Sequence, residues 1–103
     1  MEGVFGDLEG FQWDKGNGNK DYIKHNVQNW ECEQVFFNQP LFILEDTGHS
    51  GNEQRWAAFG ITDADRLLII IFTKRRNLLR VISARDMNRK ERQYYEENED
   101  AAI

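Results

Sequence analysis

The stretch that decides the fold is residues 66–85, RLLIIIFTKRRNLLRVISAR. Its apolar run, 67–72, is short and rich in β-branched side chains, which is typical of a central strand buried on both faces. We therefore predict a strand over 66–73, a charged turn over 74–77 and a second strand over 78–85. Because the connection between them is short, the two strands should pair antiparallel.

Two more strands are predicted immediately before this hairpin. Residues 54–61 have strand composition and are joined to the hairpin by the polar turn 62–65, and a short apolar run covers 41–44. The polar loop 45–53 separates these two strands. Strands connected by short polar segments favour an antiparallel meander of about four strands.

Two helices are predicted ahead of the meander. The first covers 15–26, with the Asp14 carboxylate capping its first turn. The second runs from Trp30 to Phe37 after Asn29 and is stopped by Pro40. On the second helix one apolar side is expected, made of Trp30, Cys32, Val35, Phe36 and Phe37.

A third helix is expected after the meander, because Asn88 and Glu91 have the spacing of a capping box. Phe11–Trp13 alternates and could be a short edge strand. The order of elements predicts an α+β fold: an antiparallel sheet of about four strands, with two N-terminal helices and one C-terminal helix packed on it.

Length and composition predict one small domain. The chain has 103 residues, 40% of them hydrophobic, and a single Cys, which excludes an internal disulfide framework and suits a reducing cytoplasm. No apolar stretch approaches the roughly 20 residues that cross a bilayer, and the acidic N-terminus is unlike a signal peptide. We expect a flexible leader over 1–10, a single domain over 11–96 and an acidic tail over 97–103.

Charge is distributed unevenly along the chain. The net charge is -5, yet residues 66–92 carry nine basic and two acidic side chains. An acidic protein repels nucleic acid at long range, but a basic stripe on one face can still hold a phosphate backbone. The alternative is a solvated basic surface with no nucleic-acid role.

Metal and cofactor chemistry is not expected. Neither His25 nor His49 has a zinc-ligand spacing with another His or with Cys32. Cys32 lies on the apolar side of a predicted helix and should be a buried, inert thiol. His49 lies in a Gly/Ser loop and should be solvated.

What remains is a set of cationic groups. Metal-free RNA cleavage needs a base for the 2′-hydroxyl proton, cations beside the phosphorus and an acid for the leaving oxygen. His25 or Glu53 could be the base, and Lys24, His25 or an Arg the acid. For His25 the alternative is a cation that favours the C-terminal end of the first helix. The cations considered are Lys24, His25, Arg75, Arg80, Arg85 and Arg89.

The sequence resembles the BrnT-type toxins of bacterial toxin–antitoxin pairs over roughly residues 11–96. The most specific part is Ile82-Ser83-Ala84-Arg85 followed by Glu91-Arg92. The other matching motifs are Phe11-x-Trp13-Asp14, Lys24-His25-x-Val27, Val35-Phe36, Arg55 to Gly60, Arg66-Leu67-Leu68, Thr73-x-Arg75, Arg80-Val81 and Tyr95.

The resemblance implies a compact RelE-like endoribonuclease that cuts RNA without a metal or cofactor and stops translation. It also implies a cognate ribbon-helix-helix antitoxin, with operator DNA contacted only through that partner. We expect no membrane partner and allow for a homodimer. The motif positions assigned to catalysis are Lys24, His25, Arg75, Arg80 and Arg85, and those assigned to substrate binding are Arg55, Arg76 and Arg89. Trp13 and Tyr95 are expected to serve packing.

Three positions depart from the family pattern, which usually has Lys, Asn and Gly at Asn17, Asp21 and Asn26. Losing a Lys and gaining an Asp both remove positive charge near the expected phosphate site. An alternative function follows: a catalytically weakened member that binds a DNA-binding antitoxin and serves in operon autorepression.

Overall fold

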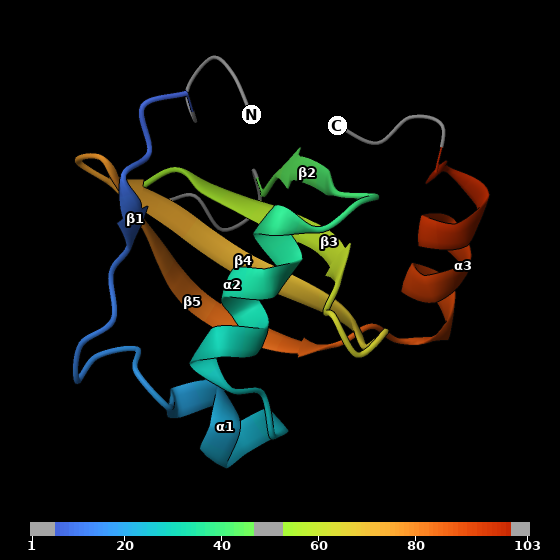
Figure 1. The fold of residues 1–103 in the computed structure, drawn as a ribbon, viewed down its shortest axis with the longest axis horizontal. Helices are drawn as coiled ribbons and strands as arrows, with labels where there is room; N and C mark the ends of the chain where they lie inside the picture. The colour runs from blue at the N-terminus through green and yellow to red at the C-terminus, as the bar shows by residue number, and fades with distance from the viewer. Residues whose placement is uncertain (1–5, 47–52, 100–103) are drawn as a thin grey trace.

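The computed structural model describes residues 6–46 and 53–99. In these residues the fold is α+β, with a five-stranded mixed sheet and three helices (Figure 1). Across the sheet the strands are β1 (Gly10–Phe11), β5 (Leu78–Asp86), β4 (Leu67–Arg75), β3 (Arg55–Ile61) and β2 (Phe42–Glu45). The helices are α1 (Lys20–His25), α2 (Asn29–Phe37) and α3 (Arg89–Glu97).

The predicted hairpin is confirmed, with β4 at the centre of the sheet. It pairs antiparallel with both β3 and β5. Leu68 and Ile70 are fully buried on one face and Ile69 is buried on the other. The strand continues through Arg75, so the turn to β5 is shorter than expected, and Arg76 takes a left-handed backbone with a φ of 58°.

The sheet differs from the predicted four antiparallel strands. β1 is a fifth strand, and it pairs parallel with β5 at Leu78 and Leu79. It lies one residue earlier than the Phe11–Trp13 strand predicted. Alternation over so few residues indicates a strand but neither its limits nor its pairing direction.

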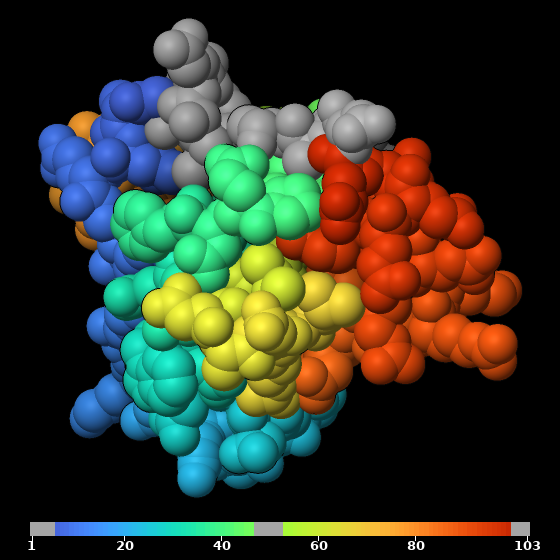
Figure 2. All heavy atoms as spheres, turned by 45° about the vertical axis from the view of Figure 1, so that its right-hand side comes forward, coloured from blue at the N-terminus to red at the C-terminus, as the bar shows by residue number. Residues whose placement is uncertain are grey.

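α2 and α3 pack on opposite faces of the sheet, and α1 lies beyond one end of it (Figure 1). Val35 and Phe36 of α2 join the core on one face, while Tyr95 of α3 packs on the opposite face against Phe42 and Phe59. In Figure 1, α2 crosses the sheet and α1 lies beyond its end. In Figure 2, the side chains of α3 project from one side of the molecule. None of the helices in the described ranges is long and apolar enough to span a membrane.

The start of α1 and the burial of the apolar side of α2 both differ from the prediction. α1 begins at Lys20 rather than Lys15, because residues 15–19 form turns, and Asp14 caps no helix. The expected apolar side of α2 is only partly buried. Cys32, Val35 and Phe36 are buried, whereas Trp30 is 57% exposed and Phe37 is 78% exposed.

A β-bulge in β5 sets which side chains share a face. Ser83 pairs with Ile71 and Val81 pairs with Phe72, so Ile82 is the extra residue. Strict alternation would put Arg80 and Arg85 on opposite faces. With the bulge, both residues lie on the face that carries α3.

Candidate functional site

Three arginines gather on the α3-side face of the sheet, at the end away from α3. Arg55 pairs with Thr73, and Thr73 pairs with Arg80, so the three residues form one row across β3, β4 and β5. Arg75 follows two residues after Thr73 on the same face. Neighbouring strands lie about 4.8 Å apart, so the backbones of Arg55 and Arg80 are separated by roughly 10 Å. We call Arg55, Arg75 and Arg80 the basic cluster.

Carboxylates from two loops hold the guanidinium groups of this cluster. Arg80 donates two hydrogen bonds to Asp14, at 2.7 and 3.1 Å, and Arg75 donates two to Glu53, at 2.7 and 3.3 Å. The hydrogen bond from Arg80 lowers the pKa of Asp14, and the one from Arg75 lowers the pKa of Glu53. Both carboxylates are therefore ionised at neutral pH.

This bidentate geometry is the one in which a guanidinium binds a phosphate. Asp14 and Glu53 thus occupy positions that two phosphate oxygens could take. Gly16 leaves room for this arrangement, because a Cβ at residue 16 would lie 2.8 Å from a terminal nitrogen of Arg80. The cluster can hold an anion between three strands.

A second group of ion pairs lies at the other end of β5. Arg85 donates to both oxygens of Glu91, at 2.7 and 2.9 Å, and Glu91 also accepts from the Asn88 backbone at the start of α3. The hydrogen bond from Arg85 lowers the pKa of Glu91. Five residues separate Arg80 from Arg85, a distance of roughly 15 Å along the strand. Arg85 therefore lies outside the basic cluster and anchors α3.

Arg66 makes the largest set of contacts at that end. It donates to Asp86, to Glu31 and to the backbone oxygens of His25 and Asn26, at distances of 2.7 to 3.3 Å. These contacts join β4, β5, α2 and the end of α1. We call Arg66 and Arg85, with their partners, the helix clamp.

Lys24 and His25 occupy the last turn of α1, beside the helix clamp. Lys24 is exposed and His25 is partly exposed. The pKa of Asp86 is lowered mainly by the hydrogen bond from Arg66, and the nearby His25 side chain acts in the same direction. The His25 backbone oxygen accepts from Arg66, and Arg66 also binds Asp86 at the end of β5 away from Arg80. Lys24 and His25 therefore lie beside the helix clamp, and a pocket that they share with Arg75 and Arg80 stays a prediction.

The remaining predicted positions are distributed over the surface. Arg76 is exposed in the turn between β4 and β5, next to Arg75, whereas Arg89 is exposed at the start of α3. His49 lies outside the described residues. Cys32 is buried, as predicted, and burial raises the pKa of its thiol to about 12. Tyr95 is buried as expected and donates a hydrogen bond to the Pro40 carbonyl.

The three departures from the family pattern turn out to lie at structural positions. Asn17 is 3% exposed and its side chain donates to the Gln12 and Val81 carbonyls. Asp21 is 5% exposed, and burial raises its pKa although the Ala84 amide bonds to it and acts in the opposite direction. Asn26 ends α1 with a φ of 58°, a conformation that Gly adopts most readily.

Sequence reasoning missed the partners of the basic cluster. Asp14 was assigned to a helix cap and Glu53 was considered only as a base. A usable signal was the excess of acidic residues in the first half of the chain, since strand arginines that are partly buried need counter-charges. Among the described residues there is no group of three His, Cys, Asp or Glu that could hold a metal ion.

Comparison with known proteins assigns the chain to a family. A family model described as the ribonuclease toxin BrnT of type II toxin–antitoxin systems matches residues 13–91. These residues include the basic cluster and the helix clamp. No curated protein matches the sequence.

Proposed function

The chain belongs to the BrnT family of ribonuclease toxins of type II toxin–antitoxin systems, and from that premise we propose that it is a metal-independent endoribonuclease that inhibits translation. The family supports ribonuclease activity and implies an antitoxin partner. The proposal adds a RelE-like mode of action, a cytoplasmic location and a ribbon-helix-helix antitoxin through which operator DNA is bound.

The observation that carries the proposal is the row of Arg55, Thr73 and Arg80 with Arg75 beside it. Guanidinium groups keep their charge at any working pH and bind phosphate with two parallel hydrogen bonds. A phosphodiester that enters the cluster would replace Asp14 and Glu53 as the acceptor. Three fixed cations then stabilise the charge that builds up on the phosphoryl oxygens.

The cleavage step needs two proton transfers. A base removes the 2′-hydroxyl proton, the 2′ oxygen attacks phosphorus, and the 5′ oxygen leaves with a proton from an acid. Glu53 is the proposed base nearest to the phosphate site, because its ionised carboxylate, once the phosphodiester has displaced it from Arg75, lies beside that site. Lys24 and His25 remain proposed proton-transfer groups for an RNA strand that reaches from the basic cluster to the end of α1.

Cleavage in the presence of a chelator tests the proposal. The purified chain is incubated with messenger RNA and EDTA, and a product ending in a 2′,3′-cyclic phosphate is expected. Lys90→Ala is the control, because it removes an exposed cation of α3 that lies outside the family motifs. Intact RNA at all concentrations of a folded wild-type chain would contradict the proposal.

The alternative of a weakened toxin rests on one observation: Arg75 and Arg80 are both bound to carboxylates. In that case the chain serves mainly to bind its antitoxin in operon autorepression. Expression without the antitoxin separates the two. Growth arrest that Arg80→Ala relieves supports the nuclease, and unimpaired growth supports the interaction module.

A further inference from the structure

The α2 helix leaves large apolar side chains uncovered on its outer side. Phe37 is 78% exposed and Trp30 is 57% exposed, values that are high for aromatic side chains in a small domain. The two residues are seven positions apart, so they lie on one stripe of the helix about 10 Å from each other. Glu33 lies between them on the same stripe.

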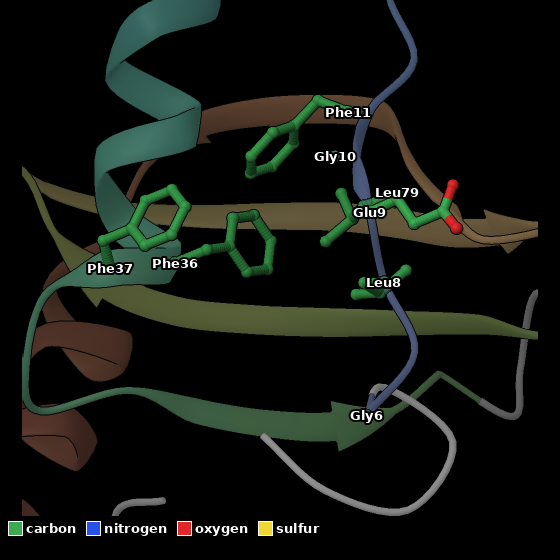
Figure 3. A pocket seen from close by; sticks show the side chains of 8 residues that line it. All are labelled: Gly6, Leu8, Glu9, Gly10, Phe11, Phe36, Phe37 and Leu79. Carbon is green, nitrogen blue, oxygen red and sulfur yellow. The ribbon is translucent and has the colours of Figure 1, made fainter.

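An apolar groove continues this stripe toward β1. It has a volume of about 400 Å³ and is lined by Leu8, Phe11, Phe36, Phe37 and Leu79, with Glu9 at its margin. Figure 3 shows the rings of both α2 phenylalanines and of Phe11 around the same hollow. The ring centre of Phe11 lies 5.7 Å from that of Phe36 and 6.3 Å from that of Phe37.

Two carboxylates belong to the groove and the stripe beside it. Glu9 lines the groove, and Glu33 lies on the α2 stripe between Trp30 and Phe37. Glu33 accepts a hydrogen bond from the Trp13 indole at 2.8 Å, and Glu9 accepts one from the Asn77 amide at 3.5 Å, so each of these bonds leaves the charge of the carboxylate uncompensated. Aromatic rings beside carboxylates bind guanidinium and ammonium groups through cation–π contacts and charged hydrogen bonds.

We propose that this acidic aromatic face, made of Phe11, Trp30, Glu33, Phe37 and Glu9, binds a basic segment of the cognate antitoxin that also carries apolar side chains. The inference rests on the proposed toxin function, which supplies the antitoxin as partner. Charge complementarity selects a basic occupant, and the groove takes its apolar side chains. The face lies on the opposite side of the sheet from Arg80, which alternates with the core residues Leu79 and Val81.

Binding of the full chain to the full-length antitoxin, measured by calorimetry, tests the face. Phe37→Ser should raise the Kd about tenfold or more, because an exposed aromatic anchor is lost. The matched control is Leu44→Ser, which truncates a side chain 44% exposed on β2 and should change the Kd by less than about twofold. Glu9→Lys should weaken binding, and the wild-type affinity should fall as salt is added.

Three outcomes would overturn the proposal. One is an equal effect of Phe37→Ser and Leu44→Ser in chains that circular dichroism shows to be folded. Another is an affinity for the antitoxin that does not respond to salt or to Glu9→Lys. The third is a chain that dimerises on its own in sedimentation experiments and becomes monomeric with Phe37→Ser, since the face would then bind a second copy.

RNA cleavage without the antitoxin is measured separately on the same proteins. Phe37→Ser should cleave RNA as the wild type does, because Phe37 lies on the opposite face of the sheet from the basic cluster. A wild-type chain that binds its antitoxin through this face but leaves RNA intact would contradict the proposed function and not the docking face.

Discussion

The two ends of β5 use the same chemistry for different purposes. At one end Arg80 grips Asp14, and at the other Arg85 grips Glu91, each with two hydrogen bonds. Asp14 also accepts from the Gly16 backbone, a bond within its own loop, whereas Glu91 caps α3 and Arg66 joins separate elements. A count of arginines therefore does not identify a binding site. The further commitments of each partner decide whether an anion could displace it.

The sharpest test of this contrast is Arg80→Ala. We expect RNA cleavage to fall by about a hundredfold or more, because a fixed donor to the phosphoryl charge is lost. The free energy of unfolding should fall by about 1 kcal/mol, because the Asp14 side chain that loses its partner is 46% exposed and water can solvate it. Single-turnover cleavage and urea unfolding give the two values.

Arg80→Lys refines the same test. Lysine keeps the charge but lacks the planar pair of donors, so cleavage should remain well below that of the wild type. Equal rates for Arg80→Lys and the wild type would contradict a bidentate role for Arg80.

The opposite pattern is expected for Arg66→Ala in the helix clamp. Its removal leaves Glu31, whose side chain is 13% exposed, without its ion pair and uncaps the last carbonyls of α1. We expect a loss of about 2–3 kcal/mol in the free energy of unfolding, measured by urea titration. A loss no larger than that of Arg80→Ala would erase the distinction between the two ends.

Asp21→Asn tests the buried carboxylate of α1 that accepts a hydrogen bond from the Ala84 amide of β5. The folded state raises the pKa of Asp21, so the native chain binds its proton more tightly than the unfolded chain. Stability is therefore lost as the pH rises above the ordinary pKa of 3.8. The variant should be more stable than the wild type by about 1 kcal/mol at pH 7, and the gain should vanish near pH 3. A gain that is independent of pH would mean that desolvation of the charge is not the cause.

The smallest expected effect concerns the counter-ion of Arg80. Asp14→Asn keeps an oxygen for the Gly16 backbone but removes the charge that competes with phosphate. RNA should bind about threefold more tightly at low salt, with a smaller gain at high salt. Fluorescence anisotropy with a labelled oligonucleotide measures this, and unchanged affinity would show that Asp14 does not compete for Arg80.

The fold was predictable where long apolar runs dominate. β4 was placed correctly because 67–72 is apolar and β-branched, and α3 because Asn88 and Glu91 form a capping box. The edge strand predicted over Phe11–Trp13 overlaps β1 at Phe11, but its parallel pairing with β5 was not predicted, since no pattern in the sequence indicates that pairing. α1 begins later in the chain than predicted, because hydrogen bonds of the Asn17 side chain hold the residues before the helix in turns.

The candidate site was only partly predictable, because its geometry depends on strand register. Arg75 and Arg80 were identified from their motif. That Arg55 lies next to them follows only from the register in which β3, β4 and β5 pair. The position of Lys24 and His25 depended on how α1 is placed against β5. The position of Arg85 relative to Arg80 depended on the bulge at Ile82, which no pattern in the sequence indicates.

The extra residue in β5 gives this strand one position of tolerance in its length. Deleting Ile82 would restore a regular pleat in which Ser83 directly follows Val81. Ala84 would still face the core, and Arg85 would stay on the face where it binds Glu91. A second deletion between Arg80 and Arg85 would exchange these two faces, so natural relatives should keep the two arginines four or five positions apart.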